Sequence, residues 1–269
     1  MTPKRLVLLF VAVLLAVARA QDSQHDKAQT ISEEIQIPRG KENLPAEQVF
    51  HNIEILKGKP ASRLPGMMQS LNRLLGVQCT YCHVAGAWEK EEPEPKRTAR
   101  HMFKMVGSIS EKYFDGRDEV TCWTCHRGSP KPPDGATEIS AGLATLPKER
   151  QQLIDSINPG PDKDSPSEHA FQNIQVFNDM PAERMARTMA VFTVVLGVDC
   201  SHCHLADQWD DDDKPEKQIT REMVRMVAGI NQQLLDSQAK VTCWTCHRGD
   251  LKPAVMPGIS QMRSHSEAI

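Results

Sequence analysis

The chain has 269 residues, which is enough for one large domain or two domains of ordinary size. Its formal net charge is −3, its isoelectric point is near 6.4, and its basic residues are neither in excess nor clustered, so we expect no nucleic-acid partner. Aromatic residues make up only 5% of the chain, which indicates that something other than side chains fills part of the interior.

The first twenty residues predict a secretory signal peptide (1–20). Lys4 and Arg5 precede an unbroken apolar run over residues 6–17, and residues 18–20 read Ala-Arg-Ala, the small-x-small pattern of a cleavage site. The run is shorter than the roughly 20 apolar residues of a bilayer span, so a retained anchor is the weaker interpretation. We therefore expect an exported, periplasmic protein without a transmembrane span in its mature chain, with an extracellular location as the alternative.

Every cysteine belongs to a C-x-x-C pair, and a histidine follows each pair directly. The motifs read CTYCH, CWTCH, CSHCH and CWTCH, and their cysteines are Cys79, Cys82, Cys122, Cys125, Cys200, Cys203, Cys243 and Cys246. A disulfide framework would not explain the histidines. Zinc sites usually combine two such pairs, or one pair with spaced histidines, and thioredoxin-like motifs are normally single.

C-x-x-C-H is instead the attachment signal for c-type haem, in which the two thiols bind the porphyrin and the histidine binds the iron. Four matches out of four pairs favour this interpretation strongly. The sequence therefore predicts four covalent haem c groups, with the proximal iron ligands His83, His126, His204 and His247.

The motifs recur at a constant offset of 121 residues. Cys79 and Cys122 lie 43 residues apart, and so do Cys200 and Cys243. Other residues keep the same offset: Phe50 and Phe171, Asn52 and Asn173, Met68 and Met189, Trp88 and Trp209, Arg100 and Arg221, Met102 and Met223, Met105 and Met226, Arg127 and Arg248. We interpret this as a tandem duplication of a two-haem module of roughly 90 residues.

The repeat divides the rest of the chain. We expect an N-terminal arm (21–44), di-haem module 1 (45–134), a linker (135–165), di-haem module 2 (166–257) and a tail (258–269). Pro and Gly near the end of the linker prevent one continuous helix, so that segment is either a flexible linker or an ordered strap.

A helix is predicted before each haem motif, and a methionine on it is the expected distal iron ligand. The first helix covers residues 64–76 in one module and 180–197 in the other. Only one methionine recurs at the same place in both copies, Met68 and Met189, each 11 residues before its cysteine pair. We assign these two to the first and third haems.

The second helix is predicted over residues 98–114 and 220–235, with Thr98 and Thr220 as N-caps. Each copy offers two methionines. An apolar face runs on from Met102 and from Met223, whereas the face of Met105 and Met226 reaches polar residues, so we place Met102 and Met223 at the centre of the buried stripe and assign them to the second and fourth haems.

Other assignments stay open. Met105 or Met226 could replace Met102 or Met223, all these methionines could be core filler, and His51 and His101 are alternatives for bis-His ligation. We expect Trp88, Trp123, Trp209 and Trp244 to pack against haem. Arg127 and Arg248 are expected to pair with haem propionates, and the acidic run 210–213 is expected to be a solvated loop rather than a cation site.

A methionine helix, C-x-x-C-H, a helix with R-x-M-x-x-M and then VTCWTCHRG follow each other twice. This order resembles the tetrahaem cytochrome subunit family of the photosynthetic reaction centre of purple bacteria, and related exported di- and tetrahaem cytochromes of non-photosynthetic bacteria. The resemblance implies two pseudo-symmetric di-haem halves, with each haem parallel to the helix that gives its sixth ligand.

The resemblance also implies three Met/His haems and one His/His haem. The extra histidine of the family lies between the second helix and the second haem motif of the first module. Here that segment reads SISEKYFDGRDEVTC and has no histidine. The departure favours Met223 for the fourth haem and weakens the case for a photosynthetic partner.

We therefore expect a mainly α multihaem cytochrome c with two tandem pseudo-symmetric di-haem modules and much irregular chain. The expected role is electron transfer between a redox protein donor and acceptor, a membrane-bound complex being one candidate partner, with no catalytic residues. The alternatives are an electron donor to a photosynthetic reaction centre, a multihaem oxidoreductase, which would need an open iron position, and a subunit of an extracellular haem filament.

Overall fold

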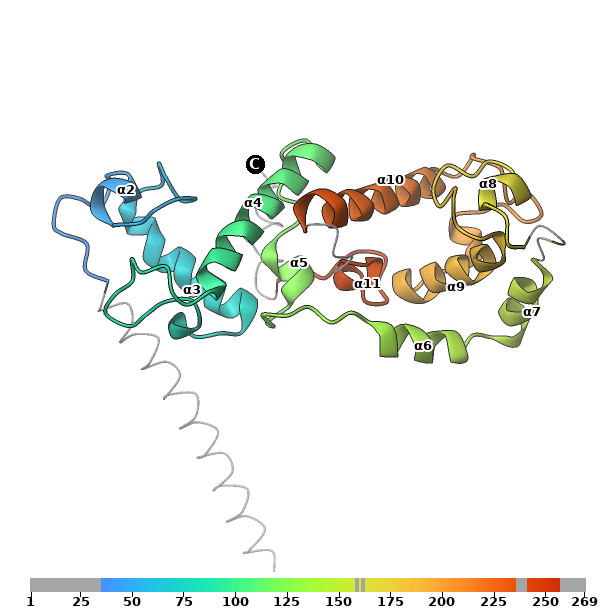
Figure 1. Ribbon diagram of the computed structural model, residues 1–269, viewed down its shortest axis with the longest axis horizontal. Coiled ribbons are helices and arrows are strands. Elements are labelled where there is room, and N and C mark those ends of the chain that lie inside the picture. The colour runs from blue at the N-terminus through green and yellow to red at the C-terminus, as the bar shows by residue number, and fades with distance from the viewer. Residues whose placement is uncertain (1–34, 158–159, 161–162, 236–240, 257–269) are drawn as a thin grey trace, which may run out of the picture. The chain divides into compact units, whose positions relative to one another are not determined.

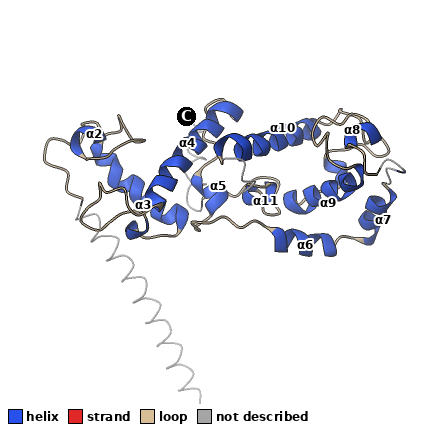
Figure 2. Cartoon of the chain, viewed as in Figure 1, coloured by secondary structure: helices blue, strands red, loops and turns tan. Residues whose placement is uncertain are grey.

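A computed structural model describes residues 35–157, 160, 163–235 and 241–256 (Figure 1). The predicted signal peptide, residues 21–34 of the predicted arm and the predicted tail lie outside the described residues. Within the described ranges the regular structure is helical, and β pairing is limited to isolated bridges such as that between Pro45 and Pro60 (Figure 2). The mainly α prediction is confirmed. None of the helices in these ranges has both the length and the apolar character that crossing a bilayer requires.

The chain divides into two compact units, Met1–Arg100 and His101–Ile269. The division falls inside helix α4 (Pro95–Tyr113), and therefore inside the first predicted module. The compact units are not the same as the two sequence repeats, because the second unit contains the end of the first module together with the second. The module boundaries remain a prediction.

The first unit places one haem motif directly behind a helix. Its elements are α2 (Ala46–Val49), η1 (Ala61–Arg63), α3 (Leu64–Leu75), η2 (Cys79–Tyr81) and the start of α4. Helix α3 ends at Gly76, whose φ of 63° is the left-handed conformation that glycine adopts without strain. The chain then turns into the first cysteine pair, and the end of α3 agrees with the predicted helix over residues 64–76.

The second unit repeats this arrangement and adds five further elements. Its helices are α5 (Cys122–His126), α6 (Ala136–Ala144), α7 (Lys148–Ser156), α8 (Ser167–Ala170), η4 (Ala182–Arg184), α9 (Met185–Leu196), η5 (Cys200–His202), α10 (Pro215–Gly229), the π-turn η6 (Ile230–Leu234) and α11 (Cys243–Cys246). The five further elements are α5, α6, α7, η6 and α11. Both α6 and α7 pack against α9. Of the two alternatives for residues 135–165, the ordered strap is the one observed over α6 and α7.

The predicted N-caps of the second helices were wrong. Thr98 and Thr220 lie inside α4 and α10, which begin at Pro95 and Pro215. Proline suits the first position of a helix, because the amide that it lacks would have no hydrogen-bond partner within the helix there. The Thr220 hydroxyl donates to the Glu216 carbonyl one turn back (2.8 Å), as a threonine in a helix interior does. Helix α9 likewise begins later than predicted, at Met185, because the turn η4 precedes it.

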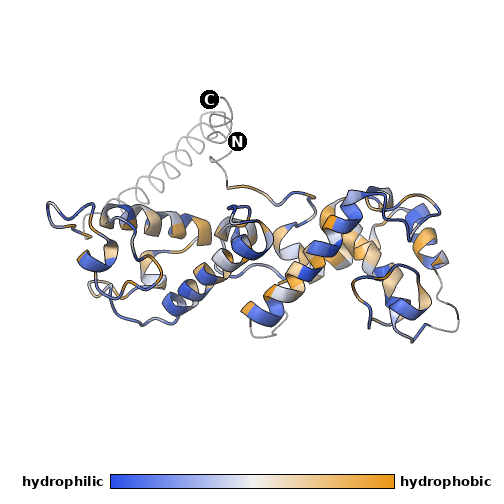
Figure 3. Ribbon diagram, turned by 90° about the horizontal axis from the view of Figure 1, so that it is seen from above, coloured by the Kyte–Doolittle hydropathy of each residue, from blue (hydrophilic) through white to orange (hydrophobic). Residues whose placement is uncertain are grey.

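One buried apolar cluster of the second unit lies between the C-terminal part of α4 and α10, and another group of buried apolar residues lies on α9. Ile109, Met226 and Ile230 are buried between α4 and α10, and Met105 and Met223 pack against them. The helices carry apolar residues on one side and polar residues on the other (Figure 3). The prediction that Met223 is at the centre of the buried stripe was wrong: Met226 is only 8% exposed, whereas Met223 is half-buried.

Residues of α4 meet their own repeat equivalents in α10. Ile109 and Ile230 share the buried cluster, and Lys112 Nζ donates to Gln233 Oε1 (2.9 Å); both pairs are 121 residues apart. Contact between residue i and its equivalent in the other copy is the mark of a two-fold interface. The second unit therefore contains an internal pseudo-two-fold axis.

Candidate functional site

Each C-x-x-C pair lies on a single helical turn, η2, α5, η5 or α11. All eight cysteines are described, and none forms a disulfide. Burial raises the pKa of the thiols of Cys82, Cys122, Cys203 and Cys243, which disfavours the thiolate that binds zinc. Within the described ranges no three His, Cys, Asp or Glu side chains are grouped to hold a metal ion.

The four motif histidines share one hydrogen-bond arrangement. In each, Nδ1 lies close to a backbone carbonyl oxygen a few residues later: His83 to Trp88 (3.2 Å), His126 to Ser129 (2.8 Å), His204 to Trp209 (3.0 Å) and His247 to Asp250 (3.1 Å). Because a carbonyl oxygen only accepts, Nδ1 carries the proton and donates, and Nε2 keeps its lone pair.

The charge state of two of these rings follows from their surroundings. Burial lowers the pKa of His83 and His204 below the usual histidine value, so both imidazoles are neutral at pH 7. A neutral imidazole that is oriented by its Nδ1–H and leaves Nε2 free is the form in which histidine binds a metal. The sequence predicted these ligands but not the carbonyl groups that orient them.

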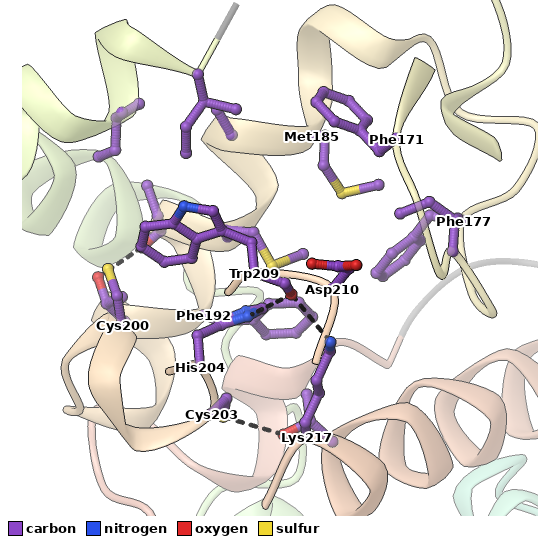
Figure 4. Close-up of a pocket in the computed structure, with 18 of the residues that line it drawn as sticks. Phe171, Phe177, Met185, Phe192, Cys200, Cys203, His204, Trp209, Asp210 and Lys217 are labelled. Atoms are coloured by element: carbon purple, nitrogen blue, oxygen red, sulfur yellow. Dashed lines mark hydrogen bonds between the residues drawn. The ribbon is translucent and has the colours of Figure 1, made fainter. Parts of the chain in front are cut away.

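The third motif faces a cavity of about 650 Å³ in the second unit (Figure 4). Cys200, Cys203 and His204 line it from one segment, and Met189, the predicted distal ligand, lines it from α9. The structure thus brings the four residues assigned to the third haem to one cavity. Met185, one turn earlier on α9, lines the same cavity, although the equivalent position in the first copy is Leu64 and offers no methionine.

The remaining walls of this cavity are largely apolar. Phe171, Phe177, Phe192 and Trp209 contribute aromatic surface, as Figure 4 shows. The volume lies in the range of about 300 to 1,000 Å³ that is typical of cofactor pockets. Two thiols, a neutral imidazole, a thioether sulfur and aromatic walls are the chemical groups that a haem c requires, so the residues fit this cofactor.

The tryptophans that follow the first and third motifs pack against the motif histidines. The ring centroids of His83 and Trp88 lie 5.7 Å apart, and those of His204 and Trp209 lie 5.4 Å apart. Each tryptophan therefore stabilises the histidine twice, through its ring and through its backbone carbonyl. The expected packing of tryptophan against haem remains a prediction.

An arginine and an acidic residue tie the same loops to the second helices. Arg221 donates to Asp212 (2.8 Å) and to the Asn173 carbonyl (3.0 Å), and Arg100 donates to Glu91 (2.5 Å) and to the Asn52 carbonyl (2.8 Å). All four partners keep the 121-residue offset.

The acidic loop is consequently not a purely solvated one. Burial raises the pKa of Asp212, but hydrogen bonds from Asn173, Lys217 and Arg221 outweigh burial and bring the pKa to about 2. Of the run 210–213, Asp212 is thus held in ion pairs, and the expectation of a solvated loop was wrong for this residue.

The second and fourth motifs touch each other at the pseudo-two-fold axis. Cys125 Sγ and Cys246 Sγ lie 3.6 Å apart. Arg127 Nη2 donates to the Cys246 carbonyl (2.6 Å), and Arg248 Nη2 donates to the Cys125 carbonyl (2.5 Å). The two arginines form a reciprocal clamp that holds the motifs together.

Each clamp arginine also has an Nε–H donor that the clamp does not use. The Nε–H groups of Arg127 and Arg248 are buried and have no hydrogen-bond partner in the described part of the chain. A buried donor of this kind is costly unless an acceptor reaches it. The two donors match the carboxylate of a haem propionate, which leaves the predicted propionate pairing open beside the clamp.

The VTCWTCHRG segments also contain a helix start that the sequence analysis missed. Thr121 and Thr242 are N-caps, and their amide nitrogens donate to the hydroxyls of Thr124 and Thr245 (3.0 Å each), which completes a capping box. The signal was present in the sequence as threonines three residues apart on either side of the first cysteine.

The two alternative histidine ligands, His51 and His101, are both exposed. His101 Nε2 lies 2.6 Å from the Leu234 carbonyl, so this nitrogen carries a proton. Met102 is half-buried on α4, and no contact in the structure selects it over Met105.

Comparison with known proteins supports the same interpretation. The family model described as photosynthetic reaction centre cytochrome C subunit matches twice, over residues 13–140 and 135–267. The two tandem matches confirm the duplication. The family is one of c-type cytochromes, which bind haem covalently.

Individual relatives of the chain are also cytochromes c. The chain is 25% identical over 252 residues to the photosynthetic reaction center cytochrome c subunit of Thermochromatium tepidum, covering 77% of this chain and 61% of that protein. It is 25% identical over 274 residues to the subunit of Roseobacter denitrificans, covering 81% and 72%. Cytochrome c-554 of Chloroflexus aurantiacus is 28% identical over 90 residues, covering 31% and 22%. The chain thus spans less than two thirds of the first of these relatives, and it belongs to the photosynthetic reaction centre cytochrome c subunit family.

Proposed function

We propose that this chain is an exported, periplasmic tetrahaem c-type cytochrome that carries electrons between a protein donor and a protein acceptor. The observation that supports this best is the shared state of the motif histidines: in all four, a backbone carbonyl holds the Nδ1–H and leaves Nε2 free beside a cysteine pair. A structural role for the histidines would not require the same tautomer four times.

The residues divide into three roles. The eight cysteines hold the cofactors covalently, and His83, His126, His204 and His247 are the proximal ligands. Met68, Met102, Met189 and Met223 are the proposed distal ligands. The cavity that Met189 shares with His204 supports this assignment for the third site. When bound, each haem c supplies a one-electron ferric/ferrous couple.

The contact between the second and fourth motifs supports transfer within the chain. Their cysteine sulfurs lie 3.6 Å apart, and the arginine clamp fixes the two motifs to each other. The two cofactor sites therefore adjoin at the pseudo-two-fold axis, with no solvent layer between the anchoring turns. Adjacent sites are the arrangement that electron hopping along a row requires.

A role as a carrier is favoured over a role as an enzyme. An iron that binds substrate needs an open or weakly held position, whereas here a methionine is available for every site. A narrower candidate is electron donation to a photosynthetic reaction centre, which the names of the relatives favour. The segment over residues 108–122 lacks the histidine expected of that family, and this favours a carrier with other partners.

Mass spectrometry of the purified, denatured protein tests the proposal. We expect four covalent haem groups on a chain that begins at Gln21, and three in the variant Cys200→Ser/Cys203→Ser. A mass without covalent haem would refute the cytochrome assignment. On the intact protein, rapid carbon monoxide binding to the reduced form would contradict the carrier role, because it reveals an open iron position.

A further inference from the structure

Two buried lysines lie behind the first and third motifs, and neither is part of the haem signature. Lys217 is only 9% exposed, although lysine is rarely buried. Its Nζ donates to the Trp209 carbonyl (2.9 Å) and to the Asp211 carbonyl (2.7 Å). The Trp209 carbonyl is the oxygen that also accepts the Nδ1–H of His204 (3.0 Å), and both dashed lines in Figure 4 end on it.

The first module repeats this arrangement. Lys96 is 8% exposed, and its Nζ donates to the Trp88 carbonyl (2.9 Å) and to the Lys90 carbonyl (2.6 Å). The Trp88 carbonyl accepts the Nδ1–H of His83 (3.2 Å). Both lysines, both tryptophans and both histidines are related by the 121-residue offset. The shared carbonyl is therefore a feature of the module.

The second and fourth motifs use a different acceptor. The carbonyls of Ser129 and Asp250 accept from His126 and His247, and in the described part of the chain no lysine donates to either of them. The lysine contact thus separates the motif histidines into two classes. If the haem motif needed this lysine contact in order to fold, the contact would be present at all four motifs.

The chemistry of the shared oxygen gives the lysine a role. A strong Nδ1–H···O bond makes an imidazole a more electron-rich iron ligand, which stabilises the ferric state. An ammonium group on the same carbonyl takes up part of the oxygen's accepting capacity and weakens the histidine hydrogen bond. Its positive charge, buried in a medium of low dielectric constant, also disfavours the extra charge of ferric iron. Both effects favour the ferrous state.

We propose that Lys96 and Lys217 are positioning residues that act through the Trp88 and Trp209 carbonyls and raise the midpoint potentials of the first and third haem sites. This inference rests on the proposed function, because it takes His83 and His204 as iron ligands. The two sites should not respond equally. Lys217 Nζ lies 3.2 Å from Asp212 Oδ1, which offsets its charge, whereas Lys96 has no carboxylate at ion-pair distance among the described residues.

The test uses the full-length holoprotein and the variants Lys96→Met and Lys217→Met. In a potentiometric titration we expect one of the four midpoints to fall in each variant. The expected shift is on the order of tenfold in the ferric/ferrous equilibrium, or about 59 mV for one electron, and it should be larger for Lys96. In NMR spectra of the ferrous protein, the Nδ1–H resonance of the affected histidine should move to lower field, because its hydrogen bond strengthens.

Two further variants separate charge from contact. Lys90→Met removes an exposed charge from the same loop and should leave all four midpoints in place. Lys96→Gln keeps a donor for the Trp88 carbonyl but no charge, so it should shift the potential less than Lys96→Met. If the methionine variants fail to fold, the glutamine variants at 96 and 217 provide the comparison.

The outcomes are distinguishable. Four haems by mass with unchanged midpoints and Nδ1–H resonances in the lysine variants would overturn the inference and leave the proposed function standing. Equal shifts in Lys90→Met and Lys96→Met would also overturn it, since the effect would then be long-range charge alone. A wild-type protein without covalent haem would refute the proposed function instead, whatever the variants do.

Discussion

The methionines of α10 have separable roles at the scale of single residues. Met226 packs with Ile109 and Ile230 in the buried cluster, whereas Met223 is half-buried beside it. A methionine surrounded by aliphatic side chains is committed to packing. Met223 has more freedom to meet an iron, which agrees with its proposed role as distal ligand of the fourth haem.

Alanine substitutions at the two positions should therefore have different effects. Met223→Ala should remove one quarter of the near-infrared band of Met-ligated ferric haem and change stability little. Met226→Ala should keep that band and lower the free energy of unfolding by about 2 to 5 kcal/mol, the usual cost of such a cavity. Near-infrared spectra and urea unfolding of both variants check this. Loss of the band in Met226→Ala would exchange the two assignments.

How far single residues could be predicted depended on how local their environment is. The arrangement of each cysteine pair and its histidine was predictable, because C-x-x-C-H fixes its own geometry on one helical turn. The burial of Met226 was not, because the partner of α10 is α4 from the other copy, and periodicity within one helix does not reveal which face meets it. The carbonyl partners of His83 and His204 depend on how the loops after the motifs fold, so they could not be predicted from the sequence either.

Helix α9 is the element on which the third site depends. It contributes Met185 and Met189 to the cavity and ends at Gly197, whose φ is 64°. A Cβ atom at Gly197 would collide with the Gly249 carbonyl, and the Gly249 amide donates to the Val195 carbonyl (2.8 Å). The end of α9 is therefore packed against the loop that follows the fourth motif.

The variant Gly197→Ala should destabilise the protein more than left-handed strain alone. Such strain costs about 1 to 2 kcal/mol, and the collision with Gly249 adds to it. Gly58→Ala is the matched control, because Gly58 has a φ of 76° and open space around its Cβ position. Urea unfolding of both variants measures the difference. Equal destabilisation would show that the contact between Gly197 and Gly249 contributes nothing.

At this scale the sequence predicted the four principal helices and the start of α3, but it missed the starts of α4, α9 and α10. Helices 64–76 and 180–197 had a glycine stop signal that α3 and α9 obey. The starts of α4 and α10 were placed three to five residues too late, because a threonine was preferred over proline as the first signal. The strap of α6 and α7 was left open, since only its packing against α9 orders it.

The molecule as a whole repeats one polar network in both modules. Hydrogen bonds from Asn52 and Arg100 lower the pKa of Glu91 against the opposing effect of burial, and the corresponding contacts bring the pKa of Asp212 from 3.8 to about 2. A carboxylate whose pKa is lower in the folded state stabilises the fold above its ordinary pKa, and this contribution is lost as the pH falls through the folded value.

Acid unfolding should therefore carry the signature of these carboxylates. Between about pH 4 and pH 2 the free energy of unfolding should fall more steeply in the wild type than in Asp212→Asn, and the two should converge below pH 2. Urea unfolding at a series of pH values measures this. Asp213→Asn, which removes an exposed charge from the same loop, is the control. Parallel pH profiles for wild type and Asp212→Asn would contradict the network.

The pairing of Lys112 with Gln233 shows what covalent fusion of two copies permits. In an assembly of two identical chains, a residue on the symmetry axis faces itself, so a lysine there would place two ammonium groups against each other. Within one polypeptide the two positions are encoded separately, and here one supplies the donor and the other the acceptor, 2.9 Å apart. Joining the copies thus removes the requirement for self-complementarity and lets the two halves specialise.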